Sequence, residues 1–182
     1  PELDPSYIDY GRVIGLKLFL LHKAYENFRL KKDLYTDEYN TFINENSEWL
    51  NDYALFMASK DYHKGVTWTS WTPEIAFREE GSIEKWTNML EDEINYYKFI
   101  QFIFFRQWMH LKQYANLKGI KIVGDLPIFI AYDSADLWAN KELFTVDERG
   151  KLLTCAGVPP DYFSPTGQLW GNPLYRWDVM EK

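Results

Sequence analysis

The sequence GIKIVGDL at residues 119–126 decides the fold that we expect for this chain. Gly119 ends a helical region, and a short apolar run with little polar alternation follows it, as in a strand buried on both faces. A helix, a glycine and a buried strand in this order are typical of an α/β protein with a parallel sheet. We therefore expect a parallel strand at residues 120–123.

Asp125 lies directly after this expected strand. In parallel α/β folds, ligands bind beyond the carboxyl ends of the strands, so the carboxylate of Asp125 would face such a site. Pro127 favours an extended conformation for Leu126. The alternative is that Asp125 only accepts hydrogen bonds from neighbouring backbone amides, and the residues alone leave both interpretations open.

A long aromatic segment at residues 156–173 follows, and we expect it to be a loop without regular structure. Loops of this length are usually functional or disordered. Disorder is a poor explanation because the loop contains four large apolar side chains: Tyr162, Phe163, Leu169 and Trp170. Gln168 and Asn172 carry amide groups that match vicinal hydroxyls, and aromatic faces suit the C–H surfaces of sugars. The alternative is a loop that Trp170 pins to its own core.

The rest of the chain is expected to be mostly helical, with a short hairpin near its end. The expected helices span residues 5–31, 36–42 and 47–64, a short segment from 73, residues 83–117 with a joint near Asp92, and residues 135–138. We expect the part from Phe99 to Trp108 to be buried on several sides, because its apolar residues lie on more than one helical face. Residues 143–146 and 152–155 are expected to pair as a hairpin.

Composition excludes several classes of partner and site. The net charge of −7 disfavours a nucleic-acid backbone, which needs clustered Lys and Arg. The most apolar run, residues 96–117, contains too many charges for a membrane span. The single cysteine, Cys155, can form no internal disulfide and fits a reducing compartment, so we expect a cytoplasmic protein. We interpret Cys155 itself as a small residue beside a strand.

The common catalytic motifs are also missing from the sequence. The three histidines are far apart and lack the spacing of paired zinc ligands, so we expect no metal site. There is no glycine-rich phosphate loop and no G-x-S-x-G elbow.

Four segments give the chain a specific family resemblance. They are GDLPI at residues 124–128, DSADLW at 133–138, AGVPPDYFS at 156–164 and GQLWGNPLY at 167–175. Together they resemble the 4-α-glucanotransferases, the amylomaltases or disproportionating enzymes of glycoside hydrolase family 77. WLNDYALF at residues 49–56 and Gln107-Trp108 resemble family positions as well.

The resemblance implies a (β/α)8 TIM barrel with inserted helical subdomains, of which this chain would hold a part. Residues 1–118 would supply a helical insertion and barrel helices, and residues 119–182 a barrel strand and an active-site loop, in one incomplete catalytic domain. The enzyme would need no cofactor and would move α-1,4-glucan segments between maltooligosaccharides. Asp125 matches an acid that contacts the sugar at the cleavage subsite. Tyr162 and Phe163 match a flexible loop over the site, and Gln168 and Trp170 match glucan-binding positions.

The chain departs from the family in one respect. A retaining glycosidase mechanism needs a carboxylate nucleophile and a second carboxyl group about 5 Å away. The family nucleophile lies in an Arg-x-Asp-His-type motif, which is absent from this sequence. We therefore expect an inactive amino-proximal to central fragment, whose catalytic residues lie beyond Lys182. The alternative is a non-catalytic glucan-binding or interaction module.

Overall fold

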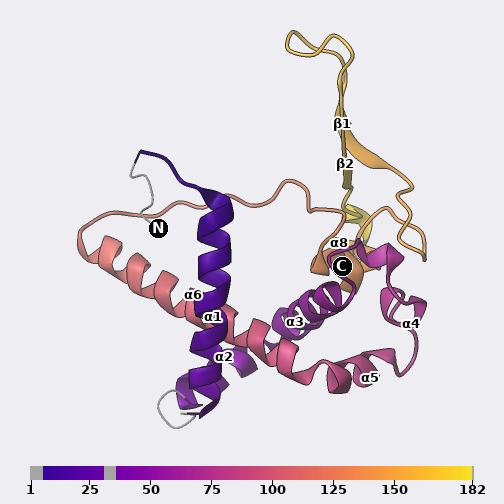
Figure 1. Cartoon of the computed structure of the whole chain (residues 1–182). Coiled ribbons are helices and arrows are strands. Elements are labelled where there is room, and N and C mark those ends of the chain that lie inside the picture. Colours follow the sequence, from indigo (N-terminus) through magenta and orange to yellow (C-terminus); the bar gives the residue numbers. More distant parts are fainter. Residues whose placement is uncertain (1–5, 31–35, 182) are drawn as a thin grey trace.

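The computed structural model describes residues 6–30 and 36–181, which form a group of helices with one small projecting sheet (Figure 1). The α-helices are α1 (Tyr10–Leu30), α2 (Thr36–Glu45), α3 (Ser47–Tyr62), α4 (Pro73–Ala76), α5 (Ser82–Met89), α6 (Glu91–Leu117), α7 (Ala135–Ala139) and α8 (Trp177–Met180). The remaining elements are the 3-10 turns η2 (Trp68–Ser70) and η3 (Lys141–Leu143) and the strands β1 (Cys155–Val158) and β2 (Gln168–Pro173).

The helix boundaries follow local signals in the sequence. The joint expected near Asp92 is confirmed, since α5 and α6 are separated at Leu90. Gly119, at a φ of 76°, follows the end of α6 in a left-handed conformation that glycine adopts without steric cost. The Ser134 hydroxyl caps α7 by accepting a hydrogen bond from Leu137 N. The first helix begins later than expected, at Tyr10, and its expected ends at residues 5 and 31 lie outside the described residues.

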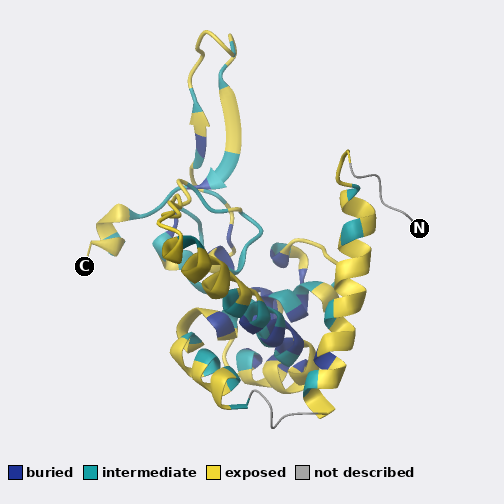
Figure 2. Ribbon diagram, turned by 90° about the vertical axis from the view of Figure 1, so that its left-hand side faces the viewer, coloured by how far each residue is buried: buried dark blue, intermediate teal, exposed yellow. Residues whose placement is uncertain are grey.

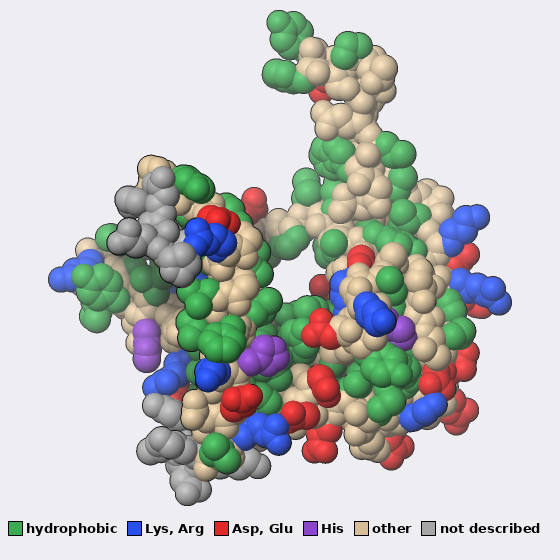
Figure 3. Space-filling model, in the orientation of Figure 1, with side chains coloured by type: hydrophobic (Ala, Val, Ile, Leu, Met, Phe, Trp, Pro, Cys, Tyr) green, Lys and Arg blue, Asp and Glu red, His purple; other side chains and the backbone are tan. Residues whose placement is uncertain are grey.

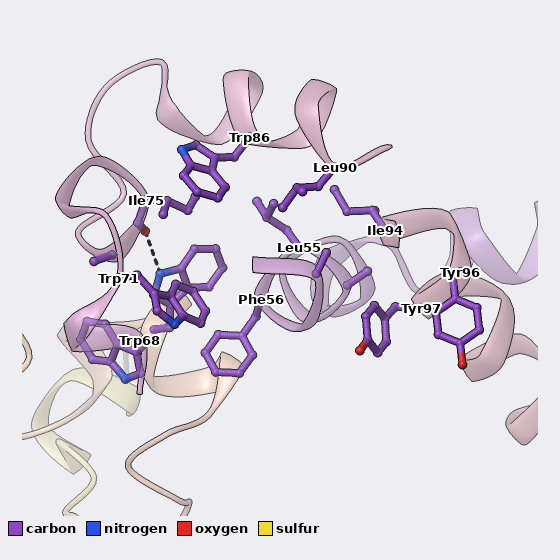
Figure 4. Close-up of a cluster of buried hydrophobic side chains, with 14 of the residues drawn as sticks. Leu55, Phe56, Trp68, Trp71, Ile75, Trp86, Leu90, Ile94, Tyr96 and Tyr97 are labelled. Atoms are coloured by element: carbon purple, nitrogen blue, oxygen red, sulfur yellow. Dashed lines mark hydrogen bonds between the residues drawn. The ribbon is translucent and has the colours of Figure 1, made fainter. Parts of the chain in front are cut away.

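The core is centred on α3, which packs against α6 on one side and α7 on another. Trp68, Ile75 and Trp138 are fully buried there, and Figure 4 labels Trp68 and Ile75 among the buried side chains. The indole of Trp138 donates a hydrogen bond of 3.0 Å to the Ile75 carbonyl, which Figure 4 marks as a dashed line. The core thus joins residues from both sides of the boundary at residues 118 and 119.

Helix α6 is buried on fewer sides than its apolar pattern indicates. Phe99 and Phe102 are buried, but Phe104 is 57% exposed and Trp108 is 37% exposed. The prediction of burial on several sides is therefore wrong for these two residues, because the described elements cover only the other side of the helix. None of the helices in the described ranges is long and apolar enough to cross a membrane.

The parallel strand expected at residues 120–123 is not formed. Residues 119–130 instead run as an extended bridge from the end of α6 to the foot of the hairpin (Figure 1), and Val123 is 91% exposed. A parallel strand needs hydrogen-bonded neighbours, and residues 6–30 and 36–181 place none beside this segment. The only sheet in that part of the chain is the antiparallel pair β1–β2, so an α/β barrel is not visible in it.

Two expectations for the last third are confirmed in part or corrected. The expected pairing of residues 143–146 with 152–155 is confirmed only as a short antiparallel contact, with one bridge between Val146 and Leu152 and a hydrogen bond from Leu153 N to Thr145 O. The segment at residues 156–173, expected to be irregular, contributes most of β1 and all of β2. Cys155 was expected beside a strand, and it lies within one, as the first residue of β1.

Candidate functional site

The hairpin of β1 and β2 projects away from the helices, and most of its surface is exposed (Figure 2). Its strands pair antiparallel, with Val158 opposite Gln168 and Gly157 opposite Leu169. A Cβ atom at Gly157 would lie 2.6 Å from the Gln168 carbonyl oxygen, so the strands can approach this closely only with glycine there. The hairpin is thus a narrow ribbon with a defined register.

Local hydrogen bonds shape the tip of the hairpin. The Asp161 carboxylate accepts from Phe163 N at 2.9 Å and from Ser164 N at 2.7 Å, and the Ser164 hydroxyl donates to Gly167 O at 2.7 Å. Tyr162 and Phe163 stand edge to face at 5.5 Å, with exposed fractions of 95% and 87%. Figure 3 shows hydrophobic side chains at the far end of the ribbon. This role of Asp161 was not predicted from the sequence. An Asp side chain that bonds the backbone amide two residues later is nevertheless a common turn signal.

Gln168 and Trp170 act as a pair on β2. The indole nitrogen of Trp170 donates to the Gln168 side-chain oxygen at 2.9 Å. This bond orients the amide and leaves its NH₂ group to donate to another molecule. Trp170 is 47% exposed and its ring meets the Phe129 ring at 6.0 Å, nearly edge to face. Trp170 therefore both anchors the ribbon and presents an open aromatic surface.

Asn172 makes a contact within the protein. Its side-chain nitrogen donates a hydrogen bond of 2.8 Å to the Ile130 carbonyl, at a partly buried position. Tyr175 adds a longer bond of 3.5 Å to the Pro127 carbonyl. The foot of the hairpin is therefore attached to residues 127–130, and the aromatic partners Phe129 and Tyr175 were missed by the sequence analysis.

Asp125 lies on the same extended bridge, shortly before this attachment. Its carboxylate is exposed and accepts a hydrogen bond of 2.9 Å from Leu126 N. This bond matches the local structural interpretation of Asp125, and the exposure leaves carboxylate oxygen available to a ligand. The structure thus attaches the Asp125 segment to the foot of the hairpin and places Tyr162 and Phe163 at its far end.

Two tyrosines of the helical part have raised pKa values and are not poised for acid–base chemistry at neutral pH. Burial raises the pKa of Tyr39 to about 12. Burial, together with a hydrogen bond to Asp61, raises the pKa of Tyr97 as well. Both phenols therefore remain protonated at neutral pH. Within residues 6–30 and 36–181, no three His, Cys, Asp or Glu side chains form a group that could hold a metal ion.

Comparisons with known proteins extend over the whole chain. The profile of a family described as 4-alpha-glucanotransferase matches residues 2–182. The chain is 48% identical over its full length to a 4-alpha-glucanotransferase of Synechocystis, and 45% identical over its full length to one of Thermus thermophilus. It covers 36% and 37% of these two proteins, so it spans about a third of their length.

A solved structure agrees with these sequence relatives. The amylomaltase from Streptococcus agalactiae, in complex with acarbose, superposes with a TM-score of 0.91 and 39% identity. The match covers 99% of this chain and 36% of that protein. With the family match over residues 2–182, these comparisons show that the chain belongs to the 4-alpha-glucanotransferase family, glycoside hydrolase family 77.

Proposed function

We propose that the chain is part of a 4-α-glucanotransferase that moves α-1,4-glucan segments between maltooligosaccharides. The observation that carries the proposal is the match of residues 2–182 to this family, with 45% and 48% identity to two proteins of that name. The related S. agalactiae amylomaltase binds acarbose, which is a maltooligosaccharide analogue, and this supports a glucan substrate.

The reaction is a retaining double displacement. An enzyme carboxylate attacks the anomeric carbon, while a second carboxyl group protonates the departing glycosidic oxygen. A sugar hydroxyl then forms a bond to that carbon as the bond to the carboxylate breaks, and its proton returns to the second carboxyl group. Since the sequence holds no Arg-x-Asp-His motif, we place both of these carboxylates outside residues 1–182 and expect the isolated chain to be inactive.

In the complete enzyme, residues of this chain would hold the glucan. The exposed carboxylate of Asp125 accepts hydrogen bonds from the hydroxyls of the sugar that is transferred. Gln168, oriented by Trp170, donates its free NH₂ group to a neighbouring hydroxyl, and the open face of Trp170 packs on a sugar ring. Tyr162 and Phe163 lie over the bound sugar and limit the access of water, so that a sugar acceptor competes for the intermediate.

We propose that the bridge at residues 120–123 is a barrel strand in the complete enzyme. Large exposed apolar side chains support this assignment, since Phe104, Trp108 and Val123 need cover in a soluble enzyme. Figure 3 also shows an opening below the bridge, between two parts of the helical group, which the described residues leave unfilled. In this proposal residues 1–118 supply the helical insertion and barrel helices, and residues 119–182 supply a barrel strand and an active-site loop. The single cysteine fits the cytoplasm as the compartment of the enzyme.

The test is disproportionation of maltotriose. The complete enzyme is expected to release glucose and form longer maltooligosaccharides, measured by anion-exchange chromatography. The isolated chain of residues 1–182, purified from a host without any related enzyme, is expected to do neither. A complete enzyme that forms no longer products would contradict the proposal, and an active isolated chain would contradict the placement of the carboxylates.

A further inference from the structure

Strand β2 contains an irregularity that changes the direction of its side chains. Cys155 pairs with Pro173 and Gly157 pairs with Leu169, so the single residue Ala156 opposes the three residues at 170–172. Gly171, in the middle of the three, has a φ of 75°, the left-handed region that glycine adopts most readily. Such bulges bend a strand and re-aim the side chains beside them.

The two side chains that flank Gly171 contact the same short segment of the bridge. Trp170 meets the ring of Phe129 at 6.0 Å with an interplanar angle of 68°. Asn172 donates its hydrogen bond of 2.8 Å to the carbonyl of Ile130, the next residue. The bulge therefore gives β2 two adjacent points of attachment to the segment that also carries Asp125.

These attachments matter because the hairpin has little other support. It consists of two strands, and a two-stranded hairpin is marginally stable in water by itself. Figure 1 shows the ribbon extending from its foot into open space, and Figure 2 shows that most of its outer part is exposed. The direction of the ribbon, and so the position of Tyr162 and Phe163 at its tip, depends on contacts at the foot.

We propose that Asn172 is a positioning residue that fixes the hairpin relative to the Asp125 segment and thereby sets how well the tip excludes water. This inference rests on the proposed function, and it adds a positioning role to the sugar contact expected for Asn172, because one N–H of its amide is bonded to Ile130. Loss of the bond leaves Asp125 in place but lets the ribbon shift, so that its tip moves away from the bound sugar.

The experiment compares two matched variants of the complete enzyme, Asn172→Asp and Asn46→Asp. Asn46, at the junction of α2 and α3, also donates a partly buried bond of 2.8 Å to a backbone carbonyl, that of Phe42. An ionised Asp cannot donate at either position. Hydrolysis and transfer with maltotriose are measured together, because their ratio does not change with the fraction of enzyme that is folded.

Asn172→Asp is expected to raise the ratio of hydrolysis to transfer by roughly three- to tenfold, the range for loss of one such hydrogen bond. Asn46→Asp should leave the ratio unchanged. Phe129→Leu provides a second test that does not depend on Asn172, and it should raise the ratio in the same direction because it removes the ring that Trp170 contacts.

An unchanged ratio in Asn172→Asp would overturn the inference, as would an equal rise in Asn46→Asp. If Asn172→Asp cannot be purified, the uncharged variant Asn172→Ser takes its place, and an unchanged ratio there would overturn the inference as well. An unaltered enzyme that transfers normally, combined with unchanged ratios in the variants, refutes only the role of Asn172. An unaltered enzyme that transfers no glucan refutes the proposed function too.

Discussion

The ring of Trp68 lies directly against the backbone of Gly150. A Cβ atom at Gly150 would be 2.1 Å from Cη2 and 2.6 Å from Cζ2 of this ring. Trp68 donates its indole hydrogen to the Tyr132 carbonyl at 3.1 Å, and the Tyr132 hydroxyl donates to the Gly150 carbonyl at 2.8 Å. These contacts join η2, the segment that follows the bridge and the turn at residues 147–150 into one unit.

Gly150→Ala is expected to lower the free energy of unfolding by about 2–4 kcal/mol, because it adds a clash with the buried Trp68 ring to the strain of a left-handed Ala. Gly65→Ala is the matched control. Gly65 has a φ of 79°, close to the 78° of Gly150, but no atom lies within 4 Å of its added Cβ. Urea unfolding followed by tryptophan fluorescence measures both, and equal losses would refute the role of the Trp68 contact.

Arg78 is a non-glycine residue with a positive φ of 54°. Its guanidinium lies 4.4 Å from the centroid of the Trp138 ring and 2.7 Å from an Asp52 oxygen. Arg78→Ala and Arg78→Gly both lose these contacts, but Gly also relieves the left-handed strain. We therefore expect Arg78→Gly to be more stable than Arg78→Ala by about 1 kcal/mol in urea unfolding. The reverse order would show that the backbone there is not strained.

Glu74 contributes stability that depends on pH. Lys85 donates to its two carboxylate oxygens at 2.8 and 2.9 Å and Trp86 donates at 2.9 Å, and these bonds lower the pKa of Glu74 below its ordinary value of 4.5. The folded state then binds the proton less tightly than the unfolded state. The contribution is complete above the ordinary pKa and is lost as the pH falls through the lowered one.

Glu74→Gln should therefore destabilise the protein at pH 7 and make its stability less dependent on pH in the acid range. Glu84→Gln, which changes an exposed carboxylate on α5, is the control. Thermal unfolding between neutral and acid pH measures the difference. If the melting temperatures of Glu74→Gln and the unaltered protein fell by the same amount as the pH is lowered, the prediction would be contradicted.

The helical half of the fold follows from signals that are local in the sequence. Gly119 and Ser134 mark a helix end and a helix start by their own conformational preferences, and the helix end at Gly119 and the helix from residue 135 were predicted. A strand at residues 120–123 would depend on neighbouring strands, so the apolar pattern of this segment alone was not sufficient to predict one. The hairpin was missed because glycines at 157, 167 and 171 interrupt the alternation that predicts strands.

The candidate site was predictable in its residue types but not in its contacts. The aromatic ring of Trp170 and the amide group of Gln168 predict sugar binding from the sequence. The structure adds the hydrogen bond between these two side chains. The bond from Asn172 to Ile130 depends on the bulge, which exists only in the paired hairpin. Side-chain type therefore predicts Asn172 as part of the candidate site, while its bond to Ile130 required the structure.

A non-catalytic binding module would behave differently from half of an active site. We expect the isolated chain to bind acarbose with a Kd weaker than about 1 mM, since it supplies only part of the contacts. Isothermal titration calorimetry measures this, and circular dichroism of the same sample checks that the chain is helical. A Kd of about 1 µM would instead favour the binding module.

The most direct test of the account is the rate of glucan transfer by the complete enzyme with Asp125→Asn. Asp178→Asn, an exposed carboxylate on α8, is the control. If Asp125 binds the transferred sugar, its variant should lower kcat/KM for maltotriose by about 10²-fold, as when one group that stabilises a transition state is removed, while the control keeps the normal rate. A rate for Asp125→Asn equal to that of the unaltered enzyme would contradict the account and leave Asp125 only its bond to Leu126.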